Sequence, residues 1–195
     1  MSGGVLVLHA WWGLNDDVLA YAQRLGQEGY VTSTPDLYRR RVATTIDEAK
    51  ALDEKLDVAR ASNEVSDALT KLRERANRVA VLGWSLGAFL GWNLVQARAA
   101  EIRAFVPYYG LRDVDASAAL PPILGHFAEH DEFEDLAQVR RTEKLLLDAG
   151  RDARLHVYPN TKHWFAEPSR PEFDQGASDL AFERTREFLD THLRR

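Results

Sequence analysis

The sequence lacks cysteine altogether, although it is 195 residues long. Disulfide bonds, zinc sites built from thiolates and a cysteine nucleophile are therefore excluded in any cellular compartment. An excess of positive charge is also missing, because 25 Lys and Arg stand against 30 Asp and Glu, a formal net charge of −5. Without a basic surface to neutralise phosphates, the chain is not expected to bind nucleic acid.

Long hydrophobic runs are absent too. The first apolar stretch, residues 5–12, is interrupted by His9 and follows no basic segment, so we expect neither a secretory signal nor a membrane-spanning segment. A cytoplasmic protein without a membrane partner is the resulting expectation. With 45% hydrophobic and 28% charged residues, the chain can bury a sizeable core, and its length predicts a single domain over residues 1–195. Both a monomer and a small homo-oligomer are compatible with the sequence.

Short apolar runs alternate with helical patterns along the chain. The runs begin near residues 5, 30, 78, 102, 123 and 154 and are typical of strands buried on both faces of a sheet. Helices are expected over residues 15–29, 45–76, 85–98, 134–149 and 177–192, and the second has a candidate break at Ser62 and Asn63. This alternation predicts parallel βαβ units and hence a three-layer α/β/α sandwich with about six mainly parallel strands.

The most informative motif is Gly83-Trp84-Ser85-Leu86-Gly87, between an expected strand and an expected helix. It matches the G-x-S-x-G pattern, in which a serine occupies a sharp strand-to-helix turn and the glycines leave room for the chain to turn. The N-terminus of the helix points its free N–H groups at charge that develops beside the serine. Ser85 is therefore the candidate nucleophile. The simpler alternative is a glycine-rich helix start that only packs tightly.

A serine nucleophile requires a histidine base and an acid that orients it, in the chain order Ser, Asp or Glu, His. Of the six histidines, His163 follows the last expected strand and lies at the edge of the sheet where functional groups gather. His9 precedes the elbow, whereas His126 and His156 lie within expected strands. His163 is the candidate base, with a packing role beside two aromatic residues as the alternative.

Asp131 is the preferred acid because it follows the strand expected near residues 123–128. Glu129 and Asp113 remain alternatives, and Asp131 could also serve only as the N-cap of the next helix. An aspartate that accepts a hydrogen bond from Nδ1–H would set the tautomer of the imidazole and stabilise the imidazolium formed during attack.

His126 and His130 stand four residues apart beside Asp131, which makes a metal site an alternative. That spacing brings two ligands together on a helix, but along a strand it separates them by about 13 Å. We therefore expect no metal ion and no other cofactor.

Two backbone amides are expected to hold the oxyanion, that of Leu86 directly after the nucleophile and that of Trp11 in the loop after the first strand. Tryptophans at four positions of the proposed site loops predict an apolar pocket for the acyl or alcohol part of a small-molecule substrate, with core packing as the alternative. Tyr38, after the second expected strand, is a further candidate substrate-binding residue. The four tryptophans are Trp11, Trp12, Trp84 and Trp164.

Together these residues resemble the dienelactone hydrolase family, a branch of the α/β-hydrolase fold. The likeness covers nearly the whole chain and implies a minimal α/β-hydrolase fold with a triad of Ser85, Asp131 and His163. It also supports Trp11 and Leu86 as oxyanion donors. Because the first strand already supplies the oxyanion loop, the resemblance implies a trimmed core without a lid domain and an open site. The segments that carry it are residues 9–15, Pro35-Asp36-Leu37-Tyr38, the elbow, residues 126–131, residues 158–165 and the final helix with Glu183-Arg184-Thr185.

Three departures limit what the resemblance implies. The family enzyme itself uses a cysteine at the position of Ser85, so activation must come from proton transfer to His163 rather than from a low thiol pKa. Ala10 stands in place of a glutamate that manages the thiol, and Glu167 in place of an arginine that binds a substrate carboxylate. A carboxylate at Glu167 is expected to repel an anionic substrate by about 1 kcal/mol in water and several times that if partly buried. The run Arg39-Arg40-Arg41 could supply the missing cation, although a solvated basic turn is the favoured interpretation.

The sequence therefore predicts a serine hydrolase of the dienelactone hydrolase type that cleaves a small carboxylic ester or lactone through an acyl-enzyme. The same triad could instead serve an acyl thioesterase or a peptidase. A catalytically silent α/β-hydrolase scaffold that acts as a binding protein is the alternative from another class.

Overall fold

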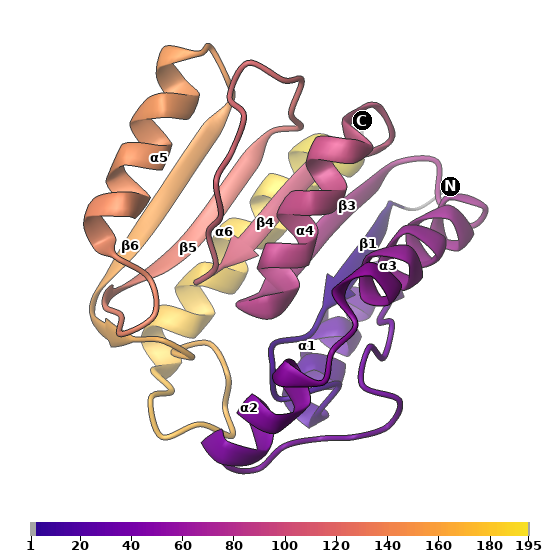
Figure 1. Cartoon of the computed structure of the whole chain (residues 1–195). Coiled ribbons are helices and arrows are strands. Elements are labelled where there is room, and N and C mark those ends of the chain that lie inside the picture. The colour runs from indigo at the N-terminus through magenta and orange to yellow at the C-terminus, as the bar shows by residue number, and fades with distance from the viewer. Residues whose placement is uncertain (1–2, 195) are drawn as a thin grey trace.

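The computed structural model describes residues 3–194, which contain a sheet of six parallel strands in the order β2-β1-β3-β4-β5-β6 (Figure 1). Every neighbouring pair runs parallel, so all carboxyl ends lie along one edge of the sheet. The predicted strand number and direction are confirmed. The strands are β1 (Gly4–Leu8), β2 (Val31–Ser33), β3 (Val79–Trp84), β4 (Ala104–Tyr108), β5 (Ile123–His130) and β6 (Ala153–Lys162).

Helices cover both faces of the sheet, which confirms the predicted three layers (Figure 1). Helices α1 and α6 pack on one face, and α3, α4 and α5 pack on the other. No helix within residues 3–194 has both the length and the apolar character needed to cross a membrane. The helices are α1 (Asp16–Gln27), α2 (Ile46–Glu54), α3 (Val58–Arg73), α4 (Leu86–Ala97), α5 (Leu136–Asp148) and α6 (Gln175–Leu193), with a short 3-10 turn at Ala99–Glu101.

The helix between β2 and β3 is interrupted, but not at the predicted place. The candidate break at Ser62 and Asn63 is wrong, because α3 runs through both residues. Instead, α2 ends at Glu54 and α3 begins at Val58. The side chain of Asp57 accepts the backbone N–H of Arg60 and so caps α3. Within α3, the buried side chains of Ala61, Val65, Leu69 and Leu72 outweigh the weak helix preference of serine and asparagine.

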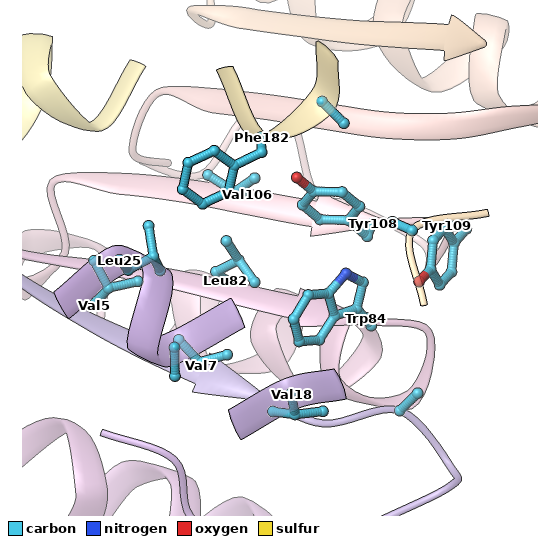
Figure 2. Packing of buried hydrophobic residues seen from close by; sticks show 14 of the residues in the cluster. Val5, Val7, Val18, Leu25, Leu82, Trp84, Val106, Tyr108, Tyr109 and Phe182 are labelled. Atoms are coloured by element: carbon cyan, nitrogen blue, oxygen red, sulfur yellow. The ribbon is translucent and has the colours of Figure 1, made fainter. Parts of the chain in front are cut away.

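The core follows from the alternation of side chains along the central strands. Val5 and Val7 pack with the helices on one face of the sheet, whereas Leu6 and Leu8 pack on the other, and all four are fully buried. Figure 2 shows the first of these faces, where Val18 and Leu25 of α1 and Phe182 of α6 pack over the strands. Burial of both faces explains why the strand sequences are almost entirely apolar.

A chain of hydrogen bonds runs through this apolar layer. The hydroxyl of Tyr108 shares hydrogen bonds with Tyr21 (2.9 Å) and with Thr185 (3.0 Å). Thr185 also pairs with His126 Nε2 (3.0 Å), and His126 Nδ1 pairs with Tyr158 (2.8 Å). Burial lowers the pKa of His126 well below its usual range, so the imidazole is neutral. The network thereby joins α1, β4, β5, β6 and α6.

Thr185→Val is expected to destabilise the protein by about 1–3 kcal/mol, because the isosteric side chain leaves His126 Nε2 buried without a partner. Urea unfolding measures the change. Thr191→Val, at an exposed position of the same helix, is the matched control and should change stability by less than about 0.5 kcal/mol. Equal stability of the two variants would contradict this role of the network.

Candidate active site

Ser85 lies between the last residue of β3 and the first residue of α4, as the motif predicted. Its backbone is strained, with φ of 48° and ψ of −109°, a conformation that few non-glycine residues adopt. Its N–H donates to the carbonyl of Tyr108 at 3.0 Å, and its carbonyl accepts the N–H of Phe89 at 2.9 Å. The surrounding structure therefore holds the elbow on both sides of the serine.

The two glycines of the motif are required by close backbone approaches. A Cβ on Gly83 would lie 2.4 Å from the carbonyl group of Gly87, and a Cβ on Gly87 would lie 2.2 Å from the carbonyl oxygen of Leu8. The second approach brings the end of β1 against the start of α4. The loop that follows β1 is thus held beside the elbow.

The structure brings Ser85, His163 and Asp131 together. His163 Nε2 lies 3.2 Å from Ser85 Oγ, and His163 Nδ1 lies 2.7 Å from Asp131 Oδ2 and 2.9 Å from Asp131 Oδ1. The side chains of His163 and Asp131 are only 5% and 1% exposed. The serine comes from the turn after β3, the acid from the end of β5 and the imidazole from the end of β6, so three strand ends supply one hydrogen-bonded row.

The carboxylate of Asp131 is held by backbone amides as well as by His163. Its Oδ1 accepts the N–H groups of Phe133 (2.8 Å) and Glu134 (3.0 Å). The cap of α5 is Asp135, not Asp131, so the alternative of Asp131 as a helix cap is wrong. Of the other two acid candidates, Glu129 accepts the N–H of Asn160 at 2.8 Å and Asp113 lies exposed between β4 and β5.

Glu134 lies next to Asp131 and connects two loops of the site. Its Oε1 accepts the N–H of Leu111 at 3.2 Å, while its own N–H points at Asp131. Burial raises the pKa of Glu134 to about 7, and the charge of Asp131 adds to the increase. The side chain of Glu134 thus connects the loop that carries Asp131 to the segment after β4.

The two expected oxyanion donors lie at the elbow and in the loop after β1. Leu86 is the first residue of α4, so its N–H is among those at a helix start that have no acceptor within the helix. Trp11 follows β1. The end of β1, at Leu8, packs closely against Gly87 of α4. Their joint action on an oxyanion stays a prediction.

Three of the predicted tryptophans form an aromatic cluster beside His163. The ring centroids of Trp12 and Trp164 lie 5.1 Å apart, those of Trp11 and Trp164 6.0 Å apart, and those of His163 and Trp164 5.1 Å apart. Sequence reasoning missed a fourth member, Phe133, whose ring lies 4.8 Å from His163 although the residue is 51% exposed. An aromatic residue in a polar turn two positions after the candidate acid was the available signal.

Trp84 does not belong to this cluster. Its buried ring packs edge-on against Tyr21 at 4.8 Å and lies 5.8 Å from Tyr108, within the layer shown in Figure 2. The prediction that Trp84 lines the pocket is corrected: Trp84 is the last residue of β3, and its side chain points into the core beneath the sheet.

Tyr38 and the arginine run lie at a different cavity. Tyr38 is buried beside His9, with ring centroids 5.2 Å apart. A cavity of about 420 Å³ is lined by Tyr38, Arg39, Arg41 and residues of α2 and α3, whereas the cavity that His163 lines is about 50 Å³ and also contacts Phe133 and Trp164. Arg39, Arg40 and Arg41 are exposed, in agreement with a solvated turn.

Glu167 is not an exposed carboxylate. The residue is 1% exposed, and its Oε1 accepts the hydroxyl of Tyr109 at 2.8 Å. Burial raises the pKa of Glu167 to about 8, so the side chain is largely neutral at pH 7. The expected repulsion of an anionic substrate by Glu167 is therefore corrected, because a neutral carboxyl bound to Tyr109 exerts no such force.

His126 and His130 do not form a metal site. Both ring nitrogens of His126 are engaged by Tyr158 and Thr185, while the side chain of His130 is 62% exposed. Within residues 3–194, no group of three or more His, Asp or Glu side chains could hold a metal ion.

Comparison with known proteins gives consistent matches over nearly the whole chain. The sequence model of the family described as "Dienelactone hydrolase family" matches residues 2–193. "Protein usf" of Aquifex pyrophilus is 30% identical over 97% of this chain and 88% of its own. "Carboxymethylenebutenolidase 1" of Cupriavidus pinatubonensis is 26% identical over 95% of this chain and 84% of its own. The solved structure of a dienelactone hydrolase-like promiscuous phosphotriesterase from metagenomic libraries has a TM-score of 0.85 at 19% identity and covers 97% of this chain and 86% of that one.

The protonation of Glu167 predicts a pH-dependent stability. Its pKa of about 8 in the folded protein lies above the ordinary 4.5, so its contribution to stability is full at low pH and is lost as the pH rises toward 8. Glu167→Gln cannot ionise. The free energy of unfolding of this variant, relative to the unaltered protein, should therefore rise by roughly 1–3 kcal/mol between about pH 5 and about pH 8.5.

Denaturant unfolding at each pH measures this difference. Glu187→Gln, at an exposed position of α6, is the control for loss of a carboxyl. The free energies of unfolding of Glu167→Gln and the unaltered protein could instead differ by the same amount at every pH. That result would show that Glu167 is already ionised at neutral pH.

Proposed function

The chain belongs to the dienelactone hydrolase family, and from this premise we propose that it hydrolyses small carboxylic esters or lactones through Ser85, His163 and Asp131. The observation that carries the proposal is the hydrogen-bonded row from Ser85 Oγ to His163 (3.2 Å) and on to Asp131 (2.7 Å), with the serine on a strained elbow. Serine hydroxyls that lie within reach of an oriented imidazole are activated for attack on acyl carbon.

In the proposed acylation step, His163 Nε2 takes the proton of Ser85 Oγ while the oxygen attacks the carbonyl carbon of the ester. The amides of Leu86 and Trp11 donate hydrogen bonds to the oxyanion of the tetrahedral intermediate. Collapse of this intermediate breaks the bond to the alcohol oxygen, which receives the proton from His163. An ester releases its alcohol, whereas a lactone opens and keeps the alcohol on the acyl group.

In the proposed deacylation step, a water molecule replaces the alcohol. His163 removes a proton from the water, the hydroxyl attacks the acyl carbon, and collapse returns the proton to Ser85 Oγ with release of the acid. Asp131 accepts a hydrogen bond from Nδ1–H throughout, which selects the tautomer with a free Nε2 lone pair and stabilises the imidazolium in both steps.

The surroundings of the triad favour a small substrate with an apolar part. Trp11, Trp164 and Phe133 lie against one another, and the last two border His163. The cavity beside His163 is about 50 Å³. Aromatic walls stabilise apolar groups by burial and ring contacts. Acyl thioesters and peptides would use the same triad, and a substrate panel separates these from oxygen esters.

Ser85→Ala is expected to lower the turnover of phenyl acetate by about 10⁶-fold if the triad acts as a unit. A fluorophosphonate probe should label the unaltered protein and fail to label this variant. Ser117→Ala, at an exposed loop position, is the matched control and should keep both properties. A folded, unlabelled and inactive unaltered protein would support the silent scaffold instead.

Phe133→Ala should change specificity more than catalysis. Removing the ring beside His163 widens the small cavity, so kcat/KM for a benzoate ester should rise at least about tenfold relative to that for an acetate ester. Kinetics on the two esters measures the ratio, with Leu147→Ala, an exposed apolar residue of α5, as control. An unchanged ratio would remove Phe133 from the substrate pocket.

A further inference from the structure

Tyr109 occupies the position where the elbow meets the end of β4. The residue before it, Tyr108, accepts the N–H of Ser85 at 3.0 Å through its carbonyl. The residue after it, Gly110, lies so close that an added Cβ would be 2.7 Å from the carbonyl oxygen of Ser85. Tyr109 itself has a φ of 33°, a conformation that is strained for a tyrosine. Both chain neighbours of Tyr109 therefore contact the backbone of Ser85, Tyr108 through a hydrogen bond and Gly110 through close packing.

The side chain of Tyr109 reaches the catalytic histidine. Its fully buried ring lies 4.8 Å from the imidazole of His163, at an interplanar angle of 57°. Its hydroxyl donates to Glu167 Oε1 at 2.8 Å. Tyr109, directly after β4, is therefore linked to the elbow by its two chain neighbours. Its side chain contacts the loop that carries His163.

Glu167 belongs to that histidine loop, four residues after His163. Turns hold its backbone, because its N–H donates to the carbonyl of Trp164 and its carbonyl accepts the N–H of Arg170, each at 2.9 Å. Within residues 3–194, its buried Oε2 has no hydrogen-bond partner. The bond to Tyr109 is therefore what directs this carboxyl, and burying a carboxyl with so little compensation is unfavourable.

The strands that carry Ser85 and His163 are not neighbours in the sheet. Strand β4 and strand β5 lie between the strand of Ser85 and the strand of His163 in the order β3-β4-β5-β6. Asp131, from the end of β5, orients the imidazole through Nδ1. That contact comes from β5, whereas the hydrogen bond between Tyr109 and Glu167 connects the loop of His163 to the end of β4, the strand next to that of Ser85.

We propose that Tyr109 and Glu167 form a positioning pair that sets the distance between His163 Nε2 and Ser85 Oγ. The inference rests on the proposed function and assigns neither residue a contact with substrate. Glu167 belongs to the loop that carries His163, and Tyr109 follows the end of β4, whose last residue holds Ser85. The hydrogen bond between the two therefore connects the loop of the base to the elbow of the nucleophile.

The charges around Glu167 are consistent with a neutral carboxyl in this pair. Burial is the main cause of its raised pKa, Asp17 of α1 and Glu172 of the same loop raise it further, and Arg170 and the hydroxyl of Tyr109 lower it. A neutral carboxyl accepts the hydroxyl of Tyr109 without placing a second negative charge near the imidazole.

Tyr109→Phe keeps the ring against His163 and removes only the hydroxyl, so it tests the hydrogen bond directly. We expect kcat for phenyl acetate to fall about 10- to 100-fold with KM within about twofold, because misplacing the base affects the transition state and not the bound ester. The rate of fluorophosphonate labelling of Ser85 should fall by a similar factor.

Variants of Glu167 provide the rescue test. Glu167→Gln keeps an acceptor of the same size and should keep kcat within about threefold, whereas Glu167→Leu should match Tyr109→Phe. The double variant Tyr109→Phe with Glu167→Leu should be no slower than either single variant, because both changes remove one interaction. If Tyr109→Phe does not fold, the comparison of Gln with Leu at position 167 decides the question.

Tyr30→Phe is the matched control, since it also removes a phenol hydroxyl that donates to a carboxylate, that of Asp190, away from the triad. It should lower stability in thermal unfolding and leave kcat unchanged. A kcat of Tyr109→Phe within twofold of the unaltered protein, or a Gln variant as slow as the Leu variant, would overturn the inference alone. Absence of Ser85 labelling in the unaltered protein would overturn the proposed function and, with it, this inference.

Discussion

The hydrogen bond from the amide of Ser85 to the carbonyl of Tyr108, at 3.0 Å, is the interaction on which the rest of the site depends. Through its backbone, Tyr108 holds the strained elbow; through its hydroxyl, it holds Tyr21 and Thr185 in the buried polar network. Tyr108 therefore connects Ser85 to the core between α1 and α6. Strain at one serine persists because the surrounding sheet and helices determine its backbone on every side.

The parallel sheet turns this local feature into a site. Each strand from β3 to β6 ends at the same edge, and each is followed by a different part of the candidate site: Ser85, Tyr109, Asp131 and His163. The contributions meet because side chains at the carboxyl ends of neighbouring parallel strands lie close together. Hydrogen bonds of Glu134 and Glu167 connect the loops that carry Asp131 and His163 to the segment after β4.

Burial gives some side chains a role that differs from the one expected from their residue type. A glutamate four residues after the candidate base is expected to carry a negative charge. Burial instead raises the pKa of Glu167 to about 8, and its carboxyl accepts the hydroxyl of Tyr109. A tryptophan next to Ser85 is expected from the sequence to line a pocket, yet the side chain of Trp84 is buried in the core. In each case the direction of the side chain, and not its type, decides what it does.

The sequence by itself determined the order of strands and helices, the glycine-flanked elbow and the three residues that the structure joins, because apolar alternation and the turn motif are local patterns that specify their own backbone. It could not determine the break before α3, the direction of Trp84, the place of Phe133 beside His163 or the protonation of Glu167. Those depend on contacts between residues far apart in the chain, such as Tyr109 with Glu167 and Phe133 with Trp11. Only the tertiary structure decided them, since burial and electrostatic environment arise when elements from distant parts of the chain pack together.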